Sequence, residues 1–227
     1  LANLSGGLNP PKLGATNFKV TAPKGGKLTG TLVGNKISTL RDDLKRLQAS
    51  IDIENNDLQA VRSKSNSNSK TYHDRVAVMR SKLQLGTTPG NPMMVEAWNA
   101  AQEQLEKVND DIGEMNSLSS RVAADASMSA YLLDATRASF GISGAVDEDH
   151  QQLEVLEDEV SQTVVLIERL LTELSDDIRR QSNYVANERN QLNTLALAIK
   201  NGEFFGPSLA STAYNVSSVK PSNVTSS

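Results

Sequence analysis

The dominant pattern in the sequence is a set of three long stretches in which apolar residues recur every three or four positions. This spacing places apolar side chains on one face of an α-helix, and its persistence over many turns is typical of helices that pack side by side. The stretches cover residues 37–85, 92–140 and 147–200. We therefore predict three amphipathic helices of nearly equal length.

The breaks between these stretches carry residues that end and begin helices. Gly86 suits the position just after a helix, Asn91 suits the N-cap, and Pro92 suits the first helical position. A second break at residues 141–144 precedes the acidic run 147–149, which complements the positive end of a helix. Because short connections between helices of matched length give antiparallel neighbours, the predicted fold class is all-α, an elongated antiparallel three-helix coiled-coil bundle.

The segment ahead of this bundle (37–201) has a different composition. Residues 1–36 are rich in Gly and Pro, and the apolar residues near position 20 alternate with polar ones before a turn-forming sequence at 23–26. This alternation predicts a small N-terminal β-hairpin. An isolated hairpin is only marginally stable in water, so we expect it to pack against a helix or against another molecule.

Two further segments do not favour a packed helix. Residues 63–69 are mostly Ser and Asn, whose side chains compete for backbone hydrogen bonds. The first helix is expected to be frayed there or to be held by its neighbours. Residues 202–227 are rich in Ser and Asn and are expected to form a flexible tail or linker.

Composition narrows the class of function. A net charge of −4, from 23 basic and 27 acidic residues, provides no basic surface of the kind that nucleic acid or an anionic membrane attracts. No apolar run is long enough to span a bilayer, and the absence of Cys excludes disulfides and thiolate sites. The first residues lack an initiator Met and a leader pattern, which leads us to expect an exported protein whose leader has been removed, or a trimmed chain.

Candidate catalytic and metal-binding residues are few. The two histidines, His73 and His150, would lie on the order of 50 Å apart in an up-down-up bundle. Asp147, His150 and Glu154 share one helical face, but no Glu-x-x-His faces them, so we interpret them as a solvated acidic helix start. His73 is interpreted as a surface histidine. Since nucleotide, zinc-protease and esterase motifs are also missing, we predict a protein that is not an enzyme and that binds no cofactor or metal.

The broadest apolar band lies in the third stretch. Six of the eight residues at 164–171 are apolar, which is wider than one narrow seam. Each helix of a three-helix bundle faces two neighbours, and this would account for the width. The alternative is an oligomer interface, for which the candidate residues are Val164, Val165, Leu166 and Leu170.

Four short segments carry a resemblance to a known family. They are Lys-Leu-Gly-Ala-Thr-Asn-Phe-Lys-Val at 12–20, the turn at 86–92, Asp-Ala-Ser-Met at 125–128 with Tyr-Leu-Leu at 131–133, and Val-Asp-Glu-Asp-His at 146–150. Together they resemble the helical N-terminal region that precedes the peptidoglycan-binding domain in certain bacterial OmpA-family envelope proteins. The resemblance covers roughly residues 1–210 and implies a periplasmic or outer-membrane-associated location and a spacer role. Residues 203–227 are too few and too polar to form the wall-binding domain, so peptidoglycan binding is assigned to no residue.

These observations lead to one functional prediction and one alternative. We predict a structural spacer or tether in the bacterial cell envelope, associated with the cell wall or outer membrane, that acts through self-association or contacts with a protein partner. The alternative is an adaptor or chaperone-like binding module of a secretion or surface apparatus.

Overall fold

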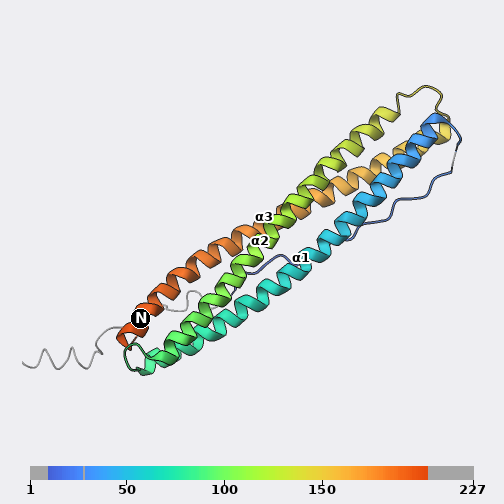
Figure 1. The fold of residues 1–227 in the computed structure, drawn as a ribbon. Coiled ribbons are helices and arrows are strands. Elements are labelled where there is room, and N and C mark those ends of the chain that lie inside the picture. Colours follow the sequence, from blue (N-terminus) through green and yellow to red (C-terminus); the bar gives the residue numbers. More distant parts are fainter. Residues whose placement is uncertain (1–9, 28, 204–227) are drawn as a thin grey trace, which may run out of the picture. The chain divides into compact units, whose positions relative to one another are not determined.

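The computed structural model describes residues 10–27 and 29–203 (Figure 1). This part of the chain is all-α, as the periodicity predicts, and contains the helices α1 (Leu32–Leu85), α2 (Pro92–Ser139) and α3 (Asp147–Asn201) and no strand. The first helix begins at Leu32 rather than at the expected residue 37, while the other bounds differ from expectation by at most one residue. The predicted tail at 202–227 lies almost entirely outside the described residues.

The contacts divide the chain into two compact units, and every helix contributes a section to each. Of the described residues, the first unit comprises 10, 68–107 and 185–203, and the second comprises 11–27, 29–67 and 108–184. The division of α1, between Ser67 and Asn68, falls inside the Ser/Asn-rich stretch at 63–69.

The core of the second unit is a set of fully buried aliphatic side chains contributed by all three helices. Burying such a side chain stabilises the fold by about 1.5–3 kcal/mol, so packing rather than helix propensity holds these sections together. Prominent members are Leu40, Leu44, Ile51 and Leu58 of α1, Met115, Leu118, Val122 and Leu132 of α2, and Leu153, Leu156, Val160, Ile167 and Leu174 of α3.

The first unit combines aliphatic packing with two hydrogen bonds from aromatic side chains. Tyr72 is fully buried, and its hydroxyl donates to the carbonyl of Glu188 at 3.3 Å. The indole Nε1 of Trp98 donates to the carbonyl of Leu192 at 2.8 Å. Each ring therefore joins a helix to α3 through its polar atom while its apolar body packs.

The turn between α1 and α2 in the first unit confirms the predicted caps. Gly86 has φ +83°, and the Asn91 side chain accepts the backbone N–H of Met93 at 3.0 Å ahead of the helix that starts at Pro92. The backbone of this turn also donates to the end of α3, from Thr87 N–H to the carbonyl of Gly202 at 2.8 Å. Gly202 has φ +83°, and a Cβ there would lie 2.4 Å from the carbonyl oxygen of Thr87, so a side chain would separate α3 from the turn.

The predicted N-terminal β-hairpin is wrong for the described residues. Residues 10–27 form no strand, and residues 11–27 run as an extended segment beside the helices of the second unit (Figure 1). Their backbone N–H groups donate to helix side chains instead of to a strand: Gly14 to Asp177 at 2.9 Å, Phe18 to Asn55 at 3.1 Å and Lys24 to Glu159 at 2.8 Å. These carboxylates and this amide satisfy donors that a β-ladder would otherwise have to satisfy.

The apolar residues of this segment are used for packing. Leu13 and Phe18 are buried and belong to the core of the second unit. The guanidinium of Arg169 lies 5.8 Å from the centre of the Phe18 ring, a distance at which a cation attracts the ring face. The alternation that suggested a strand therefore reflects an extended chain with one side turned to the helices.

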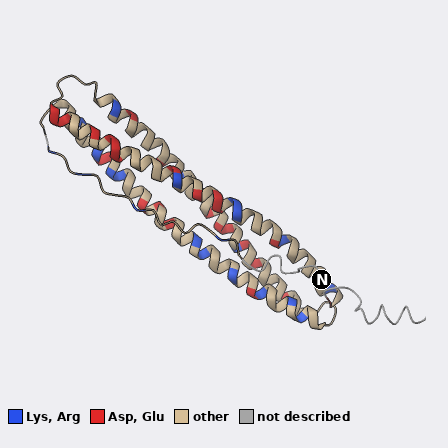
Figure 2. Ribbon diagram, turned by 180° about the vertical axis from the view of Figure 1, so that it is seen from behind, with Lys and Arg blue, Asp and Glu red and all other residues tan. Residues whose placement is uncertain are grey.

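Charges of both signs are interspersed along the helices (Figure 2). Several form ion pairs, including Glu103 with Lys107 at 2.9 Å, a pair that its helical spacing predicts. The described residues contain no helix that is long and apolar enough to cross a membrane.

Candidate functional site

The candidate interface residues of α3 differ in their exposure. Val165 is 63% exposed, while Val164 and Leu166 are half-buried. Leu170 is fully buried in the core of the second unit, so the structure assigns it to internal packing rather than to an exposed surface. The broad apolar band thus supplies both the core and a narrow outer strip.

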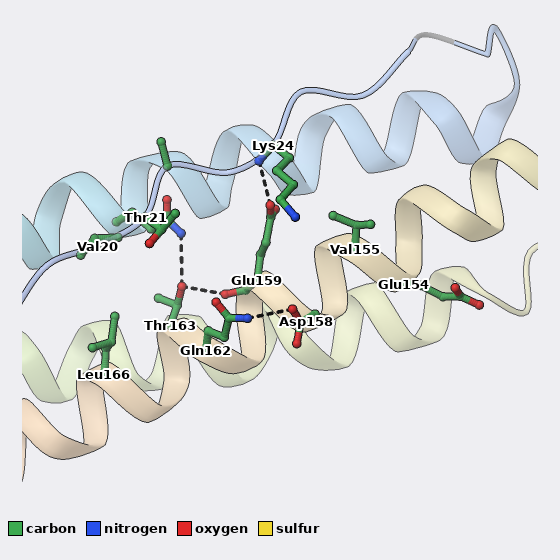
Figure 3. Close-up of a pocket in the computed structure, with 12 residues that line it drawn as sticks. Val20, Thr21, Lys24, Glu154, Val155, Asp158, Glu159, Gln162, Thr163 and Leu166 are labelled. Carbon is green, nitrogen blue, oxygen red and sulfur yellow. Dashed lines mark hydrogen bonds between the residues drawn. The ribbon is translucent and has the colours of Figure 1, made fainter.

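Leu166 lines a cleft of about 310 Å³ in the second unit (Figure 3). The N-terminal segment forms one wall of the cleft, and α1 and α3 form the others. The lining residues are Val20, Thr21, Ala22, Lys24, Gln48, Glu154, Val155, Asp158, Glu159, Gln162, Thr163 and Leu166.

The polar groups of the cleft are held in place by hydrogen bonds. The Thr163 hydroxyl donates to the carbonyl of Glu159 at 2.9 Å and accepts from the Nε2 of Gln48 at 3.3 Å. The Glu159 carboxylate accepts the backbone N–H of Lys24 through Oε1 at 2.8 Å (Figure 3). Gln48 is 6% exposed, and its Oε1, like the Oε2 of Glu159, is buried without a hydrogen-bond partner among the described residues.

The cleft is acidic. Three carboxylates line it, those of Glu154, Asp158 and Glu159, against the single cation Lys24. Lys24 is exposed and forms an ion pair with none of the described residues. The Oδ2 atom of Asp158 accepts a hydrogen bond from the Nε2 of Gln162 at 2.8 Å. This bond keeps the Asp158 carboxylate at the cleft.

A buried ion-pair cluster anchors the N-terminal segment that walls the cleft. Arg62 is 3% exposed, and its guanidinium donates to Asp177 at 2.6 Å, to Glu173 at 3.1 Å and to the carbonyl of Thr16 at 3.2 Å. Asp177 also accepts the N–H of Gly14. A buried charge pair is stable only when its remaining hydrogen-bonding groups are satisfied, and here the segment satisfies part of them.

A second anchor lies at the start of α3. Asp149 accepts the hydroxyls of Thr29 and Thr31, at 2.5 and 2.7 Å, and the backbone N–H of Val146 at 3.1 Å. Burial favours the neutral acid, but these three hydrogen bonds outweigh burial and hold the pKa of Asp149 below its usual range. Of the acidic residues at the start of α3, Asp149 therefore has a structural role, because it attaches Thr29 and Thr31 to this helix.

Glu54 of α1 is a buried carboxyl group in the second unit. It is 3% exposed, and its Oε2 is buried without a partner among the described residues. Burial, followed by the carboxylate of Asp125 on α2, raises the pKa of Glu54 to about 7, although Arg121 opposes the shift. The residue therefore titrates near neutral pH.

The two histidines belong to different compact units. His73 belongs to the first unit and is 7% exposed, so its interpretation as a surface residue is wrong. Burial, assisted by Arg80, lowers the pKa of His73 and favours the neutral ring. His150 belongs to the second unit and stacks on Phe140, with ring centres 6.2 Å apart. No group of three His, Cys, Asp or Glu in the described part of the chain is arranged to hold a metal ion.

Two other clefts are lined by described residues that contribute no buried polar side-chain atom without a hydrogen-bond partner. In the cleft beside Val61 and Leu118, Arg121 pairs with Asp57, and Lys64 pairs with Glu114. The cleft beside Trp98 in the first unit contains none of the buried polar side-chain atoms that lack a partner. The cleft at Glu159 therefore differs from both in having such atoms.

This cleft was not predicted from the sequence. Gln48 and Thr163 occupy seam positions, next to Leu47 and Val164, and a polar residue in a seam is the signal that would have drawn attention to them.

Comparison with protein-family models, with characterised proteins and with solved structures finds no match to this chain.

Proposed function

We propose that this protein is a non-enzymatic spacer or tether of the bacterial cell envelope. Its helices would keep two attachment points apart as an elongated antiparallel bundle, and its contacts would be with a protein partner or with further copies of itself.

One observation carries this proposal. Helices of 54, 48 and 55 residues each contribute, without interruption, to both compact units. Unbroken α-helices of these lengths extend for roughly 70–85 Å. Helices of this length, packed by apolar seams, suit a protein whose role depends on reach. The resemblance of residues 12–20 and 146–150 to envelope proteins supports the location, and both segments include anchoring residues, Gly14 and Asp149.

Fractionation of the native cells tests the location. We expect the protein in the periplasmic or outer-membrane fraction, and recovery with the cytoplasmic markers would contradict the proposal. Elemental analysis of the purified protein tests the non-enzymatic role: one equivalent of iron, manganese or zinc that survives chelation would contradict it.

An adaptor or chaperone-like binding module is the second candidate function. The observation that favours it is the exposed Val165 beside the half-buried Val164 and Leu166, because an apolar strip on a charged helix is a suitable contact for a partner. A soluble, stoichiometric partner recovered by affinity purification from native cells would favour the adaptor over the spacer.

A further inference from the structure

Two buried acceptor atoms of residues that line the cleft at Glu159 receive a hydrogen bond from no donor among the described residues, the lining Lys24 side chain included. The Oε1 of Gln48 and the Oε2 of Glu159 are both buried without a hydrogen-bond partner among the described residues. A buried acceptor left unsatisfied costs about 1–3 kcal/mol, and more when it is charged. A ligand that brings N–H donors would remove this cost.

The hydrogen bonds around the cleft fix both groups as acceptors. The Thr163 hydroxyl donates its single hydrogen to the carbonyl of Glu159, so it can only accept from Gln48. Gln48 must therefore turn its NH₂ group towards Thr163, which leaves its Oε1 as the free end of the amide. The other oxygen of Glu159 is held by the backbone N–H of Lys24, so this carboxylate cannot easily turn away.

Charge and apolar surface define the ligand further. Glu154 and Asp158 add two carboxylates to that of Glu159, and the cation Lys24 offsets only one of the three. Val20, Val155 and Leu166 supply an apolar wall. A volume of about 310 Å³ lies at the lower end of the range for ligand sites, so the cleft suits one side chain or a small molecule.

We propose that this cleft is a binding site for a primary alkylammonium group, with the cation placed between Glu159 and Gln48 and its aliphatic stem against Val155 and Leu166. A primary ammonium has three N–H donors and a single positive charge, which matches two acceptors and an acidic rim. The ligand is either a free aliphatic amine or the lysine side chain of a partner. This site goes beyond the spacer role and does not depend on it.

Isothermal titration of the full chain with hexylamine at low ionic strength tests the proposal. We expect saturable binding at one site, and no such site for hexanol, which has the same stem without the cation. Equal titration curves for the two compounds would overturn the proposal.

Variants assign the site to these residues. Glu159→Gln keeps an oxygen to accept the Lys24 N–H but removes the charge, and it should weaken hexylamine binding about tenfold or more. Glu154→Gln changes an exposed rim residue and should weaken binding about two- to fivefold without affecting the fold. The matched control is Glu168→Gln, an exposed glutamate of the same helix that does not line the cleft, and it should bind as the parent does.

Two further outcomes decide the matter. Parent-like binding by both Glu159→Gln and Glu154→Gln would overturn the proposal, because the amine would then bind elsewhere. If the site is supported, competition with N-acetyl-lysine amide separates the sources of the ligand. Displacement of hexylamine indicates a lysine side chain, and retention of hexylamine indicates a free amine.

Discussion

Replacing Glu54 by Gln should stabilise the second unit at and above neutral pH. Glu54 of α1 is 3% exposed, and its Oε2 has no hydrogen-bond partner among the described residues. The charged groups that act on it are Asp57 on its own helix and Asp125 and Arg121 on α2. Since Arg121 already pairs with Asp57, the Glu54 carboxylate lacks a cation of its own.

The pKa shift fixes the sign and the size of the effect. The pKa is raised from 4.5 to about 7. Below pH 4.5 the carboxyl is protonated in the folded and the unfolded chain, so it imposes no penalty. As the pH rises towards 7, only the unfolded chain loses the proton, and stability falls until the penalty is complete above about pH 7. The full shift corresponds to a ceiling of about 3 kcal/mol, and we expect about 2 kcal/mol because solvent screens part of the interaction.

Urea denaturation followed by circular dichroism between pH 5 and 8 measures this effect. Amide hydrogen exchange around Leu58 should accompany it, because it reports on the second unit specifically. The parent should lose stability from pH 5 to 8, and Glu54→Gln should lose less and exceed the parent by about 2 kcal/mol at pH 8. Glu168→Gln, which removes an exposed carboxylate of the same unit, is the control.

Two results would refute this reasoning. One is that the second unit of the parent protein is as stable at pH 8 as at pH 5, after the pH-dependent change measured for the Glu168→Gln control has been subtracted. The other is a Glu54→Gln variant without a gain at pH 8, which would mean that the carboxylate is solvated in the folded protein.

Three further predictions concern the anchors, the helix and the surface. Gly14→Ala should lower stability by about 1–3 kcal/mol in thermal denaturation, because the new Cβ would lie 2.2 Å from Nη2 of the buried Arg62; an unchanged midpoint would contradict this. Amides at 63–69 should exchange faster than those at the apolar core of α1, since their seam offers little apolar area, and equal protection would show that neighbouring helices compensate. If the protein is oligomeric, Val165→Glu with Leu166→Glu should dissociate it in light scattering with unchanged helicity; lost helicity would assign these residues to the core.

The helices could be predicted from the sequence because their signals are local. Apolar spacing, the Gly86 and Asn91 caps and the acidic start of α3 all lie within a few residues of the structure that they specify. The fold of the N-terminal segment could not be predicted in this way. Its backbone donors pair with side chains that are distant in the sequence, such as Asp177 for Gly14, and no local pattern reveals such partners.

The candidate site also combines features that have a local sequence signal with features that depend on distant partners. The sequence marks Gln48 and Thr163 as polar residues in apolar seams, but their meaning depends on which side chain each one faces. The apolar band at 164–171 was apparent in the sequence, whereas its division into a buried Leu170 and an exposed Val165 required the packing of the helices. Burial of His73 was missed for a similar reason, since a histidine next to Tyr72 and Asp74 gives no local sign of its depth.

Small-angle X-ray scattering from the monomeric or otherwise monodisperse protein tests the spacer proposal most directly. If α1, α2 and α3 remain unbroken over 54, 48 and 55 residues in solution, the maximum dimension should be at least about 75 Å. A maximum dimension below about 60 Å is shorter than any one of these helices and would contradict the proposal.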